Sequence, residues 1–234
     1  MASTTTKKAI SIILAVVILS GISVALYLYS EDRHALTYYG DAGSHLVAAR
    51  KLFDWAENPG WSQIGTVWLP LPHFLFMFPS LIDGLFYSGF AGLAVNLPST
   101  ALTSVILYKI MLRISQWIPQ KAQTKMSIYS AFSVALLYGL NPNILYLGIT
   151  AMTEALFMLF FVAAAYCILK WHDEMSENGR LSSLKFLALS SLFIVAATLC
   201  RYEGWVLPIF LIPFSLIVTV RAWKRNARGN TSQL

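Results

Sequence analysis

Long apolar runs alternate with short polar stretches along almost the whole chain. Six runs approach the roughly 20 apolar residues that a helix needs to cross a bilayer, at 9–29, 92–113, 126–147, 152–170, 184–200 and 205–221. A seventh run, 69–87, contains Pro70, Pro72 and Pro79, and prolines remove backbone donors and break helices. The pattern therefore predicts an all-α, polytopic membrane helix bundle with six full spans, in which 69–87 is a re-entrant or interfacial segment.

The composition agrees with a membrane protein. Of the 234 residues, 57% are hydrophobic and 12% are charged, whereas about 25% are charged in a soluble domain. The net charge of +6 comes from residues that flank the apolar runs, which indicates membrane orientation rather than binding to nucleic acid. Cys167 and Cys200 both lie inside apolar runs, so we expect packing residues rather than a disulfide or a zinc site.

The basic residues predict which side of the membrane each loop occupies. If 69–87 does not cross, 13 of the 17 Lys and Arg residues fall on one side, and only Arg33, Arg50, Lys51 and Arg201 fall on the other. The positive-inside rule then places the N-terminus 1–8 and the basic tail 222–234 in the cytoplasm. Residues 9–221 form a single transmembrane domain with an outer loop at 30–91. We expect an integral protein of a prokaryotic plasma membrane or of the endoplasmic reticulum.

An amphipathic helix is expected at 44–55, in the outer loop after the first span. Its apolar residues share one stripe and its charged residues the other face, which is typical of a helix in the membrane interface. Asp41 precedes this helix, where backbone N–H groups and the helix dipole favour an ionised carboxylate. Asp41 is then a general base or metal ligand, or else a helix cap. His45 is either part of a site or an interfacial side chain.

Two further outer connections carry charged residues. Glu154 opens a span after a turn at "NPN", either as a site residue or as an acid satisfied by the helix dipole. Arg201 and Glu203 share the tight connection "CRYEGW", where they form a boundary ion pair or Arg201 binds a phosphate. His73 is either a packed histidine or a site residue. Charges near bilayer depth normally face a wet cavity, so these connections indicate a catalytic or ion site.

Aromatic residues near the outer boundary are interpreted as an interfacial belt, although aromatic rings also stack on sugars. The belt consists of Tyr38, Tyr39, Trp55, Trp61, Trp68 and Trp205. The sequence contains no P-loop, GxGxxG or HExxH pattern, so nucleotide hydrolysis and zincin chemistry have no support.

Taken in order, these stretches resemble a known family. The chain contains, in sequence, "YYGDAGSHLVAARKLFDW", "GTVWLPLPHFLFMFPSLI", "NLPSTALTSVILYKI", "NPNILYLGITAMTEALF" and "TLCRYEGW". This order is similar to the N-terminal membrane core of GT-C fold glycosyltransferases. The nearest groups are the protein O-mannosyltransferases, the aminoarabinose transferases and their archaeal relatives, and the resemblance runs from about residue 9 to residue 220.

The resemblance implies an enzyme that transfers a sugar from a polyprenyl-phosphate donor in the membrane to an acceptor on the extracytoplasmic side. Asp41 matches the first-loop acid that acts as base or metal ligand, and Glu154 matches the acid that opens a later span. Together they would hold Mg²⁺ or Mn²⁺. The expected substrate-binding residues are Arg201, Glu203, His45 and His73.

The chain departs from the family pattern in two respects. Most such enzymes are longer, with further spans and a soluble C-terminal domain, so we expect a catalytic N-terminal half, a minimal core, or a split enzyme whose protein partner supplies the missing elements. Ala42 follows Asp41 where the family usually has a second acid. The alternative function is a non-catalytic membrane subunit or scaffold of a larger complex that retains a GT-C-like fold.

Overall fold

The computed structural model describes residues 4–53, 60, 68–117, 126–178 and 184–231. These residues form helices joined by turns, and no strand occurs among them, in agreement with the all-α prediction. The long helices are α1 (Thr4–Glu31), α5 (Phe90–Ser115), α8 (Glu154–Asn178) and α10 (Val206–Thr231). The shorter helices are α2 (Gly40–Arg50), α3 (Pro70–Ser80), α4 (Asp83–Ser88), α6 (Met126–Gly139), α7 (Pro142–Ile149) and α9 (Leu184–Thr198). Two 3₁₀ turns are η1 (Ala35–Thr37) and η5 (Tyr202–Trp205).

Four to five helical segments in the described part of the chain are candidate membrane spans. Four are long and apolar enough on their own: Thr4–Glu31, Phe90–Ser115, Glu154–Met175 and Tyr202–Arg221. The bent pair α6 and α7 would be the fifth. Helix α9 is apolar but has 15 residues, a length of about 22 Å against a hydrocarbon core of about 30 Å. The sixth span expected at 184–200 therefore stays a prediction.

The span expected at 126–147 is not one continuous helix. It breaks before Pro142, and its two halves are bent by 58°. The Asn141 side chain accepts hydrogen bonds from the backbone N–H groups of Asn143 and Ile144, and Pro142 occupies the first turn, where its missing N–H costs nothing. The "NPN" stretch thus starts helix α7, and this helix separates it from Glu154.

Residues 69–87 form two short helices rather than a span. Helix α3 has 11 residues, about 16 Å, which is too short to cross the hydrocarbon core. Pro70 stands in its first turn, a position that tolerates proline. Helix α3 packs against both α2 and α5, so this part of the chain covers the end of the bundle.

Helix α2 differs from the amphipathic helix expected at 44–55. It begins at Gly40, so Asp41 lies in its first turn and not before it, and residues 54 and 55 lie outside the described part of the chain. Its apolar face packs against α3 and the start of α8. The shared core contains Ala42, Leu46, Ala49, Phe76, Met152 and Leu156. The apolar face of this helix is therefore covered by protein.

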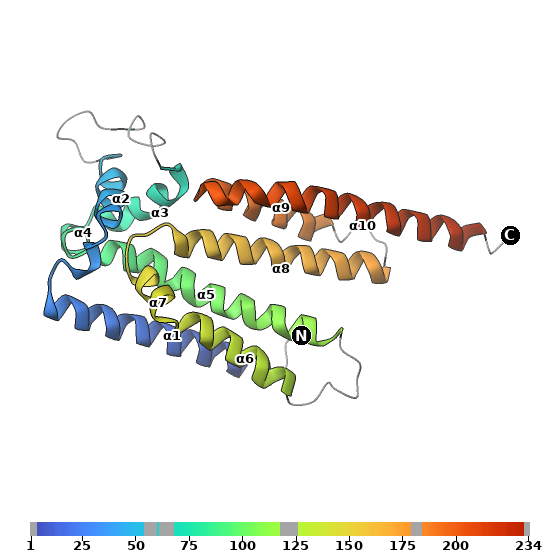
Figure 1. Cartoon of the computed structure of the whole chain (residues 1–234), viewed down its shortest axis with the longest axis horizontal. Coiled ribbons are helices and arrows are strands. Elements are labelled where there is room, and N and C mark those ends of the chain that lie inside the picture. The colour runs from blue at the N-terminus through green and yellow to red at the C-terminus, as the bar shows by residue number, and fades with distance from the viewer. Residues whose placement is uncertain (1–3, 54–59, 61–67, 118–125, 179–183, 232–234) are drawn as a thin grey trace.

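The helix directions bring three connections to the same end of the bundle. Figure 1 shows α2, α3 and α4 gathered at one end, on the left, where α1 ends, α8 begins and α9 leads into α10. The end of α5 and the end of α10 lie toward the opposite end. The connections that carry Asp41, Glu154 and Arg201 consequently share the end covered by the short helices.

Candidate functional site

A cavity of about 230 Å³ lies at this end of the bundle. Its walls come from α2, the residues before α3, the loop that enters α8 and the connection from α9 to α10. The charged and aromatic lining includes Asp41, His45, Trp68, Glu154, Arg201 and Glu203. Five of the six residues expected from the sequence thus line one cavity, although they come from distant parts of the chain.

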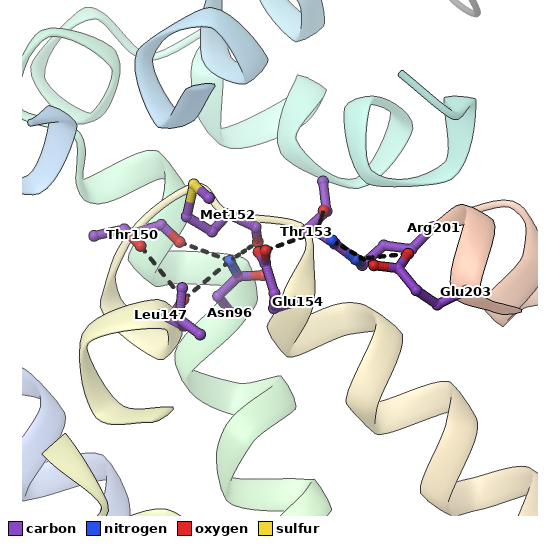
Figure 2. A network of polar contacts seen from close by, with 8 residues as sticks. All are labelled: Asn96, Leu147, Thr150, Met152, Thr153, Glu154, Arg201 and Glu203. Atoms are coloured by element: carbon purple, nitrogen blue, oxygen red, sulfur yellow. Dashed lines mark hydrogen bonds and ion pairs between the residues drawn. The ribbon is translucent and has the colours of Figure 1, made fainter. Parts of the chain in front are cut away.

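Arg201 lies between two glutamates (Figure 2). Its Nη1 donates to Oε1 of Glu154 at 2.6 Å and to Oγ1 of Thr153 at 3.1 Å. Its Nη2 and Nε donate to the two carboxylate oxygens of Glu203 at 2.8 Å and 3.2 Å, which is the bidentate geometry typical of arginine and carboxylate. Hydrogen bonding to Glu203, followed by the charge of Glu154, raises the pKa of Arg201. The boundary ion pair expected from the sequence is present, and it includes Glu154 as well.

The cavity lining carries a surplus of negative charge. Asp41, Glu154 and Glu203 share the lining with the single cation Arg201. His45 adds no positive charge at neutral pH, because burial, and then electrostatic interaction with His73 and Arg201, lower its pKa to about 4. Such a surplus attracts a cation, or a ligand that brings one, in preference to a bare anion.

The donor set for a divalent cation is incomplete but chemically suitable. Oε2 of Glu154 is buried and has no hydrogen-bond partner among the described residues, and unpaired carboxylate oxygens are the ligands that Mg²⁺ prefers. No group of three or more His, Cys, Asp or Glu side chains within the described ranges could hold a metal by itself. Asp41 and Glu154 would therefore need water or substrate oxygens to complete the coordination, as Mg²⁺ usually does.

Asn96 of α5 fixes the loop that leads into α8. Its fully buried side chain donates from Nδ2 to the carbonyl oxygens of Thr150 and Met152, both at 2.6 Å (Figure 2). One turn earlier, Gly92 permits close approach of the same loop, since a Cβ there would lie 2.4 Å from the backbone nitrogen of Ala151. These two positions on one face of α5 hold the loop that ends at Glu154.

Sequence reasoning missed two of these residues. Asn96 is an amide inside an apolar span, and a polar group there is costly unless it is hydrogen bonded, so its position was a usable signal. Trp68 was assigned to the interfacial belt, but it lines the cavity and its ring centroid lies 4.5 Å from that of His45. Trp55 and Trp61 of the same belt lie outside the described residues.

His73 is the one expected site residue that does not line the cavity. It is buried behind His45, with its Nε2 3.0 Å from Nδ1 of His45. The contact joins α3 to α2, so His73 reaches the cavity only through the other imidazole.

Comparisons of this chain with protein-family models, with curated proteins and with solved structures find no match. The resemblance to GT-C glycosyltransferases therefore stays a prediction from the order of the motifs. The function must be argued from the cavity and its charges.

Proposed function

We propose that the chain is a membrane glycosyltransferase, or the catalytic N-terminal half of one, that moves a sugar from a polyprenyl-phosphate donor to an acceptor at the extracytoplasmic surface. The observation that carries the proposal is the shared cavity of Asp41, Glu154 and Arg201, which come from three separate connections. A polyprenyl phosphate keeps its chain in the bilayer and its phosphate at the surface. A site for it belongs at the end of a helix bundle, beside the spans.

Asp41 is the proposed general base. It is exposed, lies in the first turn of α2 and lines the cavity, so its carboxylate is accessible to a bound acceptor. The base accepts the hydroxyl proton of the acceptor while the acceptor oxygen forms a bond to C1 of the sugar. The bond from C1 to the phosphate oxygen breaks in the same step, and its electron pair leaves with the phosphate.

Arg201 is the proposed partner of the leaving phosphate. Its Nε and Nη2 are directed at the two oxygens of Glu203 in a geometry that phosphate oxygens also adopt. The Glu203 side chain is 59% exposed, so a phosphate would displace it while Glu154 keeps hold of Nη1. In the alternative role of Asp41 as a metal ligand, a divalent cation held by Asp41 and Glu154 would neutralise further charge on the phosphate.

Sugar transfer by the purified chain tests this proposal, with a panel of radiolabelled undecaprenyl- and dolichyl-phosphate sugars as donors. Asp41→Asn and Glu154→Gln keep the side-chain size and remove the charge, so each lowers the transfer rate by about 10² to 10⁴-fold. Asp83→Asn is the matched control, because Asp83 pairs with Arg50 at 2.5 Å at the same end of the bundle. That variant keeps its rate within about twofold. Unchanged transfer in both site variants would rule out the mechanism.

A non-catalytic membrane subunit is the second candidate function. The observation that favours it is the saturation of Arg201, since four of its N–H···O contacts already go to Glu154, Glu203 and Thr153. This cluster ties the start of α8 to the connection between α9 and α10, which is a sufficient structural role. Copurification with a larger membrane protein, and no transfer by the isolated chain with any donor of the panel, would favour the subunit.

A further inference from the structure

Two lysines meet over one aromatic ring at the end of the bundle opposite the cavity. Lys170 belongs to α8, and Lys185 lies in the first turn of α9. Their Nζ atoms lie 4.2 Å and 4.8 Å from the ring centroid of Phe186. The end of α8 and the start of α9 lie toward the end where α5 and α10 finish (Figure 1). Two like charges are therefore held closer together than the Debye length of about 10 Å.

The packing of α8 on α9 determines where the two lysines meet. The two helices are consecutive and run antiparallel (Figure 1). Oγ of Ser190 on α9 donates to the carbonyl oxygen of Ala164 on α8 at 3.0 Å, and both residues are buried. In an antiparallel pair with this register, residue 170 of α8 stands opposite residue 184 of α9, next to Lys185. The meeting of the two charges is thus fixed by helix packing.

The positive charge at this point is only partly balanced. The charged groups that act on Lys170 are Arg113, Glu174 and Lys185. Arg113 already pairs with Asp173, and neither lysine forms an ion pair within the described part of the chain. One carboxylate, that of Glu174, therefore faces two ammonium groups.

The start of α9 increases the surplus of positive charge. The first turn of a helix carries the positive end of the helix dipole, where a cation is disfavoured and an anion is favoured. Lys185 lies in this turn, and the turn contains no acidic residue. Long basic side chains near the ends of membrane helices usually extend separately toward water. An anion between Lys170 and Lys185 would relieve their repulsion and would also face the helix terminus favourably.

The surface beside the two lysines is apolar. Leu184, Leu189 and Leu192 are exposed on α9, and this helix is apolar along its 15 residues. A small free anion would contact the ammonium groups alone. A ligand with an anionic head and hydrocarbon chains would contact the ammonium groups and the exposed leucines together.

We propose that Lys170 and Lys185 bind the phosphate of an anionic phospholipid whose acyl chains lie along the exposed leucines of α9. Each ammonium group donates to a phosphate oxygen in a charge-assisted hydrogen bond, and Phe186 holds the two groups at the spacing that one phosphate bridges. Basic pockets between membrane helices bind anionic headgroups in this way. The site shares no residue with the cavity of Asp41 and Arg201, so the proposal does not depend on sugar transfer.

Lipid binding to the full chain in a neutral detergent tests the site. Phosphatidylglycerol and the zwitterionic phosphatidylcholine are titrated separately, and native mass spectrometry counts the bound lipids. We expect phosphatidylglycerol to bind more tightly. Lys170→Gln and Lys185→Gln each weaken its binding about fivefold, the effect of one basic residue at an anionic headgroup, and leave phosphatidylcholine unaffected. Lys185 is exposed, so its substitution tests the site even where Lys170→Gln lowers the melting temperature. Equal binding of the two lipids overturns the proposal.

A matched control separates a site from a general attraction. Lys109→Gln removes the same charge at the same end of the bundle, but Lys109 belongs to α5 and is not among the described lysines that contact the Phe186 ring. Its binding of phosphatidylglycerol stays within about twofold of the wild type. An equal loss in Lys109→Gln overturns the site. Inorganic phosphate in excess is expected to leave the lipid bound. Displacement by inorganic phosphate would show that a free anion suffices and would overturn the lipid assignment.

Discussion

Two arginine–carboxylate pairs involve opposite ends of α8, and they look alike as isolated contacts. Arg113 near the end of α5 donates from Nε to Asp173 of α8 at 2.5 Å, with side chains 20% and 17% exposed. Arg201 donates to Glu154 at 2.6 Å, with side chains 28% and 29% exposed. Distance and burial alone would give both pairs the same role.

Their surroundings separate them. The carboxylate of Asp173 also lies 3.2 Å from Nδ1 of His172, so this carboxylate meets one guanidinium and one imidazole. Arg201 meets a second carboxylate, Glu203, and lines a cavity that also contains Asp41. The Arg201 cluster is a candidate site because its acids outnumber its single cation and because these residues line a cavity. The Arg113–Asp173 pair joins the end of α5 to α8, and we expect it to have a structural role alone.

The largest expected effect comes from removal of each arginine. Arg201→Leu leaves three acids of the cavity without their cation and takes away the proposed phosphate contact, so transfer falls about 10³-fold. Arg113→Leu takes the guanidinium away from Asp173, which keeps only its contact with His172; this costs about 2 kcal/mol of stability and leaves transfer intact. Transfer assays and thermal unfolding in detergent measure both effects. Equal losses of transfer in the two variants would remove the distinction between the two ends.

The next largest effect is expected at Asn96, whose side chain holds the loop that leads to Glu154. Asn96→Leu preserves the side-chain size and deprives two buried carbonyl groups of their donor, a cost of about 3 kcal/mol. Transfer falls as well, because the freed loop no longer holds Glu154. Ser190→Ala is the matched control, since Ser190 is buried and donates to the Ala164 carbonyl of α8 away from the site. It costs about 1 kcal/mol and keeps transfer. A drop in stability without a drop in transfer for Asn96→Leu would contradict the positioning role.

Part of this site could be predicted from the sequence because membrane helices alternate in direction. Apolar length identified α1, α5, α8 and α10 as candidate spans, and alternation brings every second connection to the same end. This is why the sequence alone could group Asp41, Glu154 and Arg201 before the distances between them were known. Local signals also indicated that 69–87 would not form one long helix, since it carries three prolines.

The remaining features depend on contacts between residues far apart in the chain. Asn96 reaches Thr150 across 54 residues, and no local pattern reveals such a pairing. Helix α2 starts at Gly40, a poor helix former, because its apolar face packs on α3 and tertiary packing outweighs propensity. The break at Asn141 did have a local signal, a cap residue followed by proline, which hydropathy alone had concealed.

Acid pH is expected to weaken the protein through the histidine pair at the site end. The pKa of His45 is about 4 in the folded chain and about 6.5 in an unfolded one, so the unfolded state binds more protons between these values. Stability is therefore highest above pH 6.5 and is lost as the pH falls toward 4. From pH 7 to pH 5.5 the loss from this residue is about 1 kcal/mol. Chemical unfolding at several pH values measures the slope, and His45→Asn reduces it. An unchanged slope in that variant would assign the effect to other groups.

Glu203 gives the smallest and most discriminating test of the comparison. Glu203→Gln weakens the bidentate hold on Arg201 while Glu154 keeps the guanidinium in place. The Glu203 side of the pair is largely exposed, and the pair is worth less than about 1 kcal/mol. Because the phosphate then competes with a weaker partner for Arg201, the polyprenyl-phosphate donor should bind about threefold more tightly. Asp173→Asn releases Arg113 in the same way at the opposite end and should leave donor affinity unchanged. Weaker donor binding in Glu203→Gln would mean that the carboxylate contacts the substrate instead of yielding its place to the phosphate.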